Sequence, residues 1–221
     1  MNTQRGYIWL LVFAVSAFVL AWSLSAVQIV EAQSRYIPTE DSRLWIEGTS
    51  TVRDFSCAAQ ELLGEAWLAT AADDMEEVEV DPADVEEEEA NRAHLEVRVP
   101  VDSLVCGRDR ETRDLFRTMR GERFPEIVFE LRDALVTRAP DGREVDHALH
   151  VTGELSIAGV SRIVELVAWA DRLEDGRVFA TGTKKLAMTD FEMDPPSAML
   201  GVIRAADEIE VHFEIYARPD G

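Results

Sequence analysis

The chain of 221 residues is poor in the residue types that usually carry catalysis. It has four histidines and two cysteines, and only two of its 22 basic residues are lysines. It contains no Gly-x-Ser-x-Gly elbow and no glycine-rich phosphate loop after a strand, so it offers no motif for seryl chemistry or nucleotide binding. His147 and His150 have a spacing that could ligate a metal, but no third ligand stands at a fixed offset. We therefore predict a protein that is not an enzyme, with no metal and no cofactor, and keep a metal-dependent enzyme using this pair as an alternative.

Positive charge is also scarce. The formal net charge is −21, which disfavours nucleic acid as a partner because phosphate binding requires a basic surface. About half of the excess lies in one place, since residues 73–89 hold eleven acidic side chains and no basic one. We interpret residues 73–91 as an acidic loop insertion between strands. A low-affinity calcium site is the alternative there, although the Asp-x-Asp-x-Asp-Gly spacing that organises oxygen ligands is absent.

One long hydrophobic run is present, and it lies at the start of the chain. Residues 7–30 carry no charge, Arg5 precedes them, and Val30-Glu31-Ala32 has the small residues of a signal-peptidase site. Signal cores are about 7–15 residues long, whereas about 20 apolar residues span a bilayer. Residues 1–32 are thus predicted to be either a signal peptide cleaved near Ala32 or an uncleaved anchor, with residues 7–30 as a membrane tether. Both predict an exported protein of the periplasm or cell envelope.

The two cysteines, Cys57 and Cys106, form an even pair. In an exported protein such a pair most simply indicates a disulfide. Closing their separation of 49 residues would stabilise the fold by roughly 3–4 kcal/mol in the chain-entropy model. A reactive thiol is the alternative, but neither cysteine has a histidine or acid at a recognisable spacing.

Beyond residue 42 the hydrophobic pattern has period two, which indicates β-strands. Strands are expected at 43–50, around 55, and at 62–68, 94–101, 126–136, 150–157, 161–170, 177–189 and 208–217. One short helix is expected within 108–120, with Gly121 ending it, and residues 190–205 are expected to be irregular. About eight antiparallel strands in a single domain predict an all-β protein, either an up-and-down barrel or a strongly curled sandwich.

The inward phase of these strands is apolar. An eight-stranded barrel is just wide enough either to be filled by its own side chains or to hold one slender ligand, and the sequence leaves both open. From strand phase alone, the residues expected to line the interior are Leu44, Ile46, Val97, Val99, Ile127, Phe129, Leu155, Ile157, Val211 and Phe213.

The helical segment is expected to lie near the mouth of the barrel. Leu115, Phe116 and Met119 cluster at helical spacing and suit an adaptable apolar lid, although ordinary packing of a helix on a sheet explains them equally well. Residues 108–123 hold six arginines against four acids, an exception in an acidic chain. Our hypothesis is that Arg113 and Arg117 meet an anionic head group such as a phosphate.

Several segments, in this order and spacing, resemble the YceI-like family of exported bacterial lipid-binding proteins. Phe-Pro-x-Ile-x-Phe at 124–129 followed by Thr-Gly-x-Leu-x-Ile-x-Gly-Val at 152–160 is the strongest combination. The other matching segments are 42–46, 101–104, 113–114, 188–191 and 207–209. The chain departs from the family in its acidic insertion, in its cysteine pair, and in Ser50, where many members carry a histidine.

This resemblance implies an eight-stranded antiparallel, lipocalin-like β-barrel over residues 36–218, with one short helix near its mouth. It also implies a periplasmic, non-enzymatic protein that sequesters a long-chain amphiphile, such as a polyisoprenoid quinone or polyprenyl phosphate. The alternative is a filled barrel without lipid ligand that acts as a stress-response or interaction module. A homodimer is a further expectation that nothing in the sequence decides.

Overall fold

The computed structural model describes residues 34–68, 93–140, 145–198 and 202–220. The predicted signal peptide or anchor at 1–32 and the acidic insertion at 73–91 lie outside the described residues. Among the residues that are described, no helix has both the length and the apolar character needed to cross a membrane.

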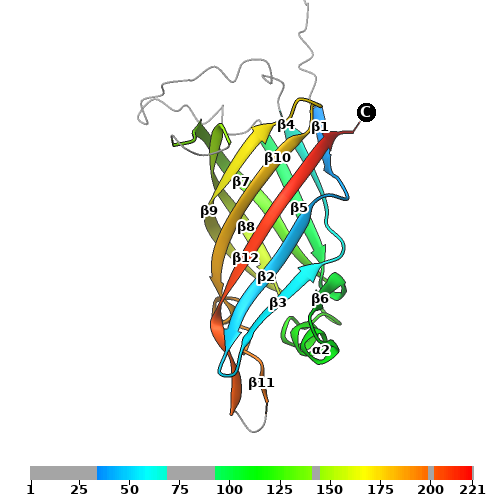
Figure 1. Cartoon of the computed structure of the whole chain (residues 1–221), viewed down its shortest axis with the longest axis vertical. Coiled ribbons are helices and arrows are strands. Elements are labelled where there is room, and N and C mark those ends of the chain that lie inside the picture. The colour runs from blue at the N-terminus through cyan, green and yellow to red at the C-terminus, as the bar shows by residue number, and fades with distance from the viewer. Residues whose placement is uncertain (1–33, 69–92, 141–144, 199–201, 221) are drawn as a thin grey trace, which may run out of the picture. The chain divides into compact units, whose positions relative to one another are not determined.

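Antiparallel strands and one α-helix make up the described fold (Figure 1). The elements are β1 (Ser34–Pro38), β2 (Arg43–Ser50), β3 (Asp54–Ala59), β4 (Leu63–Leu68), β5 (Ala93–Pro100), η2 (Val101–Ser103), β6 (Leu104–Cys106), α2 (Asp109–Thr118), β7 (Glu126–Arg138), β8 (His147–Ile157), β9 (Val160–Arg172), β10 (Val178–Ala187), η3 (Met188–Phe191), β11 (Ser197–Ala198) and β12 (Ile203–Pro219).

The strands close into an eight-stranded antiparallel barrel, as predicted. Neighbours follow the order β1-β4-β5-β7-β8-β9-β10-β12, and β1 pairs with β12 to complete the ring. Strands β2, β3 and β6 continue β1, β4 and β5 toward one end of the barrel, where β2 pairs with β12, β3 with β2, and β6 with β3. Three of the eight barrel strands are therefore interrupted, and the interruptions lie side by side.

The interruptions are held by local hydrogen bonds. Between β1 and β2, the Ser42 hydroxyl donates to the Tyr216 carbonyl and accepts from the Tyr216 amide, so it replaces a backbone hydrogen bond that the interrupted strand would have made to β12. At the other two breaks, the Gln60 amide donates to the Ser103 carbonyl. Pro100 is the last residue of β5, which pairs with β4 on one side and β7 on the other, so this proline, which has no amide hydrogen to donate, stands where the strand ends and η2 begins.

The hydrophobic core lies at the end of the barrel that carries α2. Val101, Leu104, Met119 and Phe191 are among the most deeply buried side chains, each at most 2 % exposed. They come from η2, β6, the C-terminal end of α2 and η3, whereas the walls contribute inward-facing residues such as Ile46. The connections at this end are thus packed as tightly as the strands, and they position the site described next.

Candidate ligand-binding site

A cavity of about 330 Å³ opens at the α2 end of the barrel. This volume falls within the range of about 300–1,000 Å³ typical of small-molecule sites. Its wall is mainly apolar and comes from β2, β3, α2, η3 and β12, together with the residues that join them. The apolar lining residues are Ile46, Val52, Phe55, Leu115, Met119, Met188, Met193, Pro196, Ile203, Ala205 and Ile209.

The β2–β3 hairpin forms one wall because its inward phase faces the cavity. The turn is closed by Ser50, whose hydroxyl donates to the Arg53 carbonyl at 2.7 Å and accepts from the amides of Val52 and Arg53. One step along β2, the Phe55 ring covers Gly48 so closely that a Cβ there would stand 2.3 Å from its Cζ. Glycine at this position lets the aromatic ring lie flat against the wall.

Helix α2 forms the opposite wall. Asp109 and Glu111 lie in its first turn and Arg117 in its last, which matches the sign of the helix dipole at each end. Leu115 and Met119, four residues apart and thus on one helical face, both line the cavity. The sequence predicts a helix here because this segment has apolar residues at helical spacing among arginines and acids, and its role as a lid stays a prediction.

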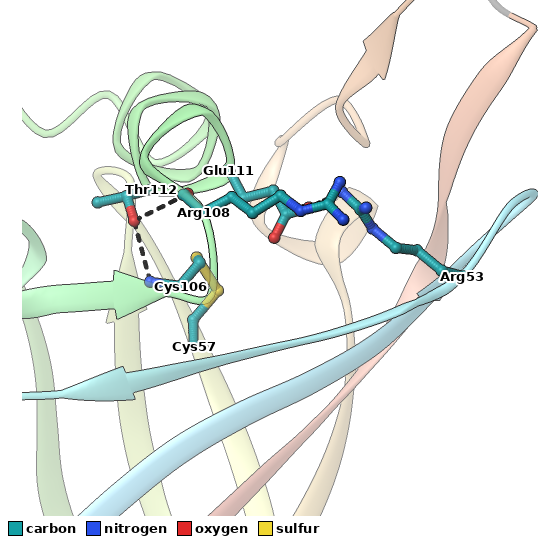
Figure 2. Close-up of a disulfide and its surroundings, with 6 residues drawn as sticks. All are labelled: Arg53, Cys57, Cys106, Arg108, Glu111 and Thr112. Carbon is teal, nitrogen blue, oxygen red and sulfur yellow. Dashed lines mark hydrogen bonds and ion pairs between the residues drawn. A yellow bond between two sulfur atoms is a disulfide. The ribbon is translucent and has the colours of Figure 1, made fainter.

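The predicted disulfide is present, and it lies close to the start of this helix. Cys57 of β3 and Cys106 of β6 are joined with an S–S distance of 2.01 Å, and both line the cavity (Figure 2). The Cys106 amide donates to the Thr112 hydroxyl of α2 at 2.9 Å. Because β3 is the one strand that pairs with β6 in the described chain, the disulfide and this hydrogen bond hold both β6 and α2 against the barrel.

The rim of the cavity is charged. Arg53 pairs with Glu111 across the gap between the β2–β3 hairpin and α2. Within the helix, Arg110 pairs with Asp114 at 3.5 Å. The side chain of Arg108 reaches from the start of α2 toward Arg53 (Figure 2), and in the described residues its guanidinium has no hydrogen-bond or ion-pair partner. At the rim, Arg108 therefore has no partner among the described residues, whereas the neighbouring Arg53 and Arg110 are paired with carboxylates.

The lid residues predicted from the sequence divide into two groups. Leu115 and Met119 line the cavity, whereas Phe116 packs over Gly121 at the end of the helix. Arg117 pairs with Asp114 at 3.2 Å, and neither Arg113 nor Arg117 belongs to the cavity wall. The arginines that do line it are Arg53, Arg108 and Arg110, so the hypothesis of an anionic head group moves to these three.

The predicted barrel lining lies on the inner face, mostly further along the barrel. Ile46 is the member of this set that reaches the cavity. Ile46, Val99 and Ile157 are buried in the core cluster, and Leu44, Ile127, Phe129, Leu155 and Val211 are half-buried against it. Val97 pairs with Phe129, and the Phe213 ring covers Gly182. Whether these ten residues contact a ligand stays a prediction.

Sequence reasoning missed part of the cavity wall. Met193, Pro196 and Ile203 come from the segment expected to be irregular, where no periodic signal indicates which side chains point inward. It also missed Lys184, which pairs with Val211 and so occupies an inward-facing position between Gly182 and Leu186. Its ammonium donates to the Glu165 carbonyl at 2.7 Å. The phase of Leu186 along β10 was the signal that could have found it.

The histidine pair considered as a metal site does not converge. His147 and His150 are three residues apart on β8, so their side chains leave opposite faces of the strand. In the described part of the chain, no group of three or more histidine, cysteine, aspartate or glutamate side chains could hold a metal ion. His212 lies on the outer wall, where its ring stacks on Trp45 with centroids 5.0 Å apart.

A closed antiparallel barrel with an apolar cavity at one end defines a lipocalin-like binding barrel. The family model described as YceI-like domain matches residues 55–217. The chain belongs to the YceI-like family, which confirms the resemblance found in the sequence.

Solved structures share the fold at low sequence identity. BcnA of Burkholderia cenocepacia superposes with a TM-score of 0.56 at 15 % identity, covering 79 % of this chain and 95 % of its own. A polyisoprenoid-binding domain of Saccharophagus degradans gives 0.58 at 12 % identity, with 85 % and 99 % coverage. A mutant of the Campylobacter jejuni YceI protein gives 0.50 at 17 % identity, with 75 % and 84 % coverage. No curated protein matches the chain.

Proposed function

We propose that this chain is an exported, non-enzymatic binding protein that sequesters a long-chain amphiphile, such as a polyisoprenoid, with the apolar chain entering beneath α2. The observation that carries the proposal is the apolar cavity of about 330 Å³ at the end of a closed barrel. Family membership and the polyisoprenoid-binding domain that shares the fold support it.

The wall chemistry favours a flexible apolar chain. Met119, Met188 and Met193 contribute three thioether side chains, which adapt their shape to irregular ligands. Burial of each ligand CH₂ is worth roughly 0.8 kcal/mol, so a long chain binds tightly without any specific polar contact. Beyond Ile46 and Ile209, the next inward residues of β2 and β12 are Leu44 and Val211, which would continue the apolar path into the barrel.

The rim favours an anionic or strongly polar head group. Arg108 has no partner among the described residues, and Arg53 and Arg110 already hold carboxylates. A phosphate or a quinone carbonyl at the rim would satisfy the free guanidinium. Arg108→Gln should therefore weaken binding of a polyprenyl phosphate more than binding of the matching uncharged prenol. The double change Arg113→Gln and Arg117→Gln should alter the affinity for neither ligand. If this double change weakens phosphate binding and Arg108→Gln does not, the head group binds at Arg113 and Arg117 instead.

Ligand identity is tested by native mass spectrometry of protein purified from its own host, followed by solvent extraction. An added mass that extracts as a long-chain lipid supports the proposal, and protein that carries no lipid and takes up none on incubation with prenols contradicts it. The location is tested with Ala205→Leu, which fills the cavity, and with Ala58→Leu, which faces outward on β3. Only the first should reduce the bound lipid. Cell fractionation tests the proposed export.

A further inference from the structure

Two exposed valines project at the end of the barrel that carries the cavity. Val52, at the tip of the β2–β3 hairpin, is 61 % exposed, and Val202, the residue before β12, is 71 % exposed. Thr51 joins the β2–β3 turn to the start of β12, because its hydroxyl donates to the Val202 carbonyl at 3.1 Å and its amide donates to the Arg204 carbonyl at 3.0 Å. The valines thus belong to one surface, and Val52 also lines the cavity.

The charge of this surface differs from that of the rest of the chain. Three arginines and two carboxylates line the cavity, a local excess of positive charge in a chain of net −21. Arg108 lacks a partner in the described residues. Apolar side chains beside arginines are the pattern of proteins that rest on anionic membrane surfaces, where the apolar groups enter the head-group boundary and the cations meet phosphates.

We propose that this end of the barrel docks on a bilayer containing anionic lipids, with Val52 and Val202 inserted, so that the ligand passes directly between bilayer and cavity. This inference rests on the proposed function, because docking is useful only if the protein binds a membrane lipid. A long apolar chain crosses water slowly, and direct contact with the bilayer avoids that step. Few apolar groups insert, so the association is weak and reversible, as a carrier requires. The net negative charge of the chain keeps its other faces away from the same lipids.

The outer barrel wall supplies a matched control. Ile163 of β9 is as exposed as Val52, at 61 %, but it lies on the outer face of the barrel wall, where it pairs with Glu154 of β8. It has no role in the cavity. Val202 is also outside the cavity lining, so changing it tests docking without altering the wall that holds the ligand.

Docking is tested by fluorescence quenching on vesicles of phosphatidylglycerol and acyl-brominated phosphatidylcholine. The Val202→Trp variant should show emission quenched by the vesicles, after subtraction of the wild-type signal, and high salt should reverse it. The Ile163→Trp variant should show no quenching. Equal quenching of both variants, or quenching of neither, would overturn the proposal. This readout needs no bound ligand.

The link to ligand transfer is tested with NBD-labelled geranylgeraniol. Val202→Asp should slow its transfer from anionic vesicles about tenfold, corresponding to about 1.4 kcal/mol, while Ile163→Asp leaves the rate unchanged. Both variants should match wild-type affinity for the probe in detergent micelles. If Val202→Asp takes up the probe at the wild-type rate, the docking inference is wrong and the proposed function is unaffected. Failure of every form, wild type included, to bind the probe in micelles counts against the proposed function, and the quenching result then decides docking by itself.

Discussion

Arg120 donates a hydrogen bond from Nη2 to the backbone carbonyl of Glu192 at 2.5 Å, and both residues have left-handed backbone with φ of 54°. The same guanidinium donates from Nη1 to the Ala158 carbonyl at 3.4 Å, and Ala158 is left-handed as well, with φ of 53°. One side chain therefore ties together the end of α2, the β8–β9 turn and the end of η3, at three positions where non-glycine backbone is strained.

Replacing Arg120 by Met should destabilise the protein by about 1–2 kcal/mol, because two backbone carbonyls lose a charged donor while the aliphatic stem is kept. The measurement is urea unfolding followed by circular dichroism. Arg113→Met is the control, since it removes the same charge from an exposed side chain with no partner in the described residues, and it should change stability by less than about 0.5 kcal/mol. Equal losses of stability from the two changes would mean that the loss of one positive charge, and not the loss of the two hydrogen bonds from Arg120, lowers the stability.

Removing the disulfide should loosen β6 and α2 more than the rest of the barrel. The double change Cys57→Ser and Cys106→Ser should cost roughly 3–4 kcal/mol, the loop-closure value for a 49-residue separation. Hydrogen exchange should accelerate in β6 and α2 well before it does in β8 and β9, because β6 pairs with a single strand in the described chain. A uniform acceleration across all strands would contradict a local role for the disulfide.

Gly48→Ala should reduce ligand binding with a moderate loss of stability. The new Cβ would stand 2.3 Å from Cζ of Phe55, so the ring must move into the cavity, at a cost of about 1–3 kcal/mol. Trimming the ring in Gly48→Ala with Phe55→Leu should recover binding, as measured by titration with a prenol in micelles. Gly107→Ala is the control, since a Cβ there meets no atom within 4 Å. Binding that is unaffected by Gly48→Ala would show that this wall does not touch the ligand.

Stability should fall in acid partly through Asp207. Hydrogen bonds from the Thr189 hydroxyl at 2.6 Å and the Thr189 amide at 2.9 Å hold the pKa of this carboxyl below its ordinary value. A lowered pKa in the folded state contributes stability that is fully present above the unfolded value of about 3.9 and is lost as the pH falls through the folded value.

Asp207→Asn should therefore lower the unfolding temperature at neutral pH and flatten its decline below about pH 4. Thermal unfolding between neutral and acid pH measures both effects. Asp190→Asn serves as the control, because the Asp190 carboxylate makes no hydrogen bond or ion pair in the described part of the chain. A parallel acid decline in wild type and Asp207→Asn would assign the pH dependence to other carboxyls, such as Glu154, whose pKa is lowered by its hydrogen bond from Arg132.

The strand pattern could be predicted because each strand has one buried face. The alternation of Leu44 and Ile46 with Arg43 and Glu47 is visible in the sequence, and a shift of one residue would turn the apolar side chains outward. The three breaks could not be predicted in this way. They depend on where strands of different length meet in the closed ring, and Pro100 gave the one local signal.

The cavity was only partly predictable, for a similar reason. Leu115 and Met119 were indicated by helical spacing, whereas Met193 and Ile203 come from a segment without periodicity. Arg113 and Arg117, the two arginines chosen from the sequence, do not line the cavity, because a charge pattern alone does not indicate which face of the helix meets the barrel. Whether an arginine binds a head group stays a prediction. Arg108, at the start of the helix, reaches the rim, and Arg113 does not.

By itself, the sequence determined the β class, the antiparallel strands and the position of the single described α-helix, because local periodicity needs no knowledge of distant neighbours. The family resemblance then favoured a barrel over a curled sandwich, and the even count of cysteines favoured the pairing of Cys57 with Cys106. Only the tertiary structure decided where the apolar cavity lies and which charges surround it. A cavity is the space left when side chains from separate elements pack against one another, and here those elements lie as far apart in the chain as Ile46 and Ile209.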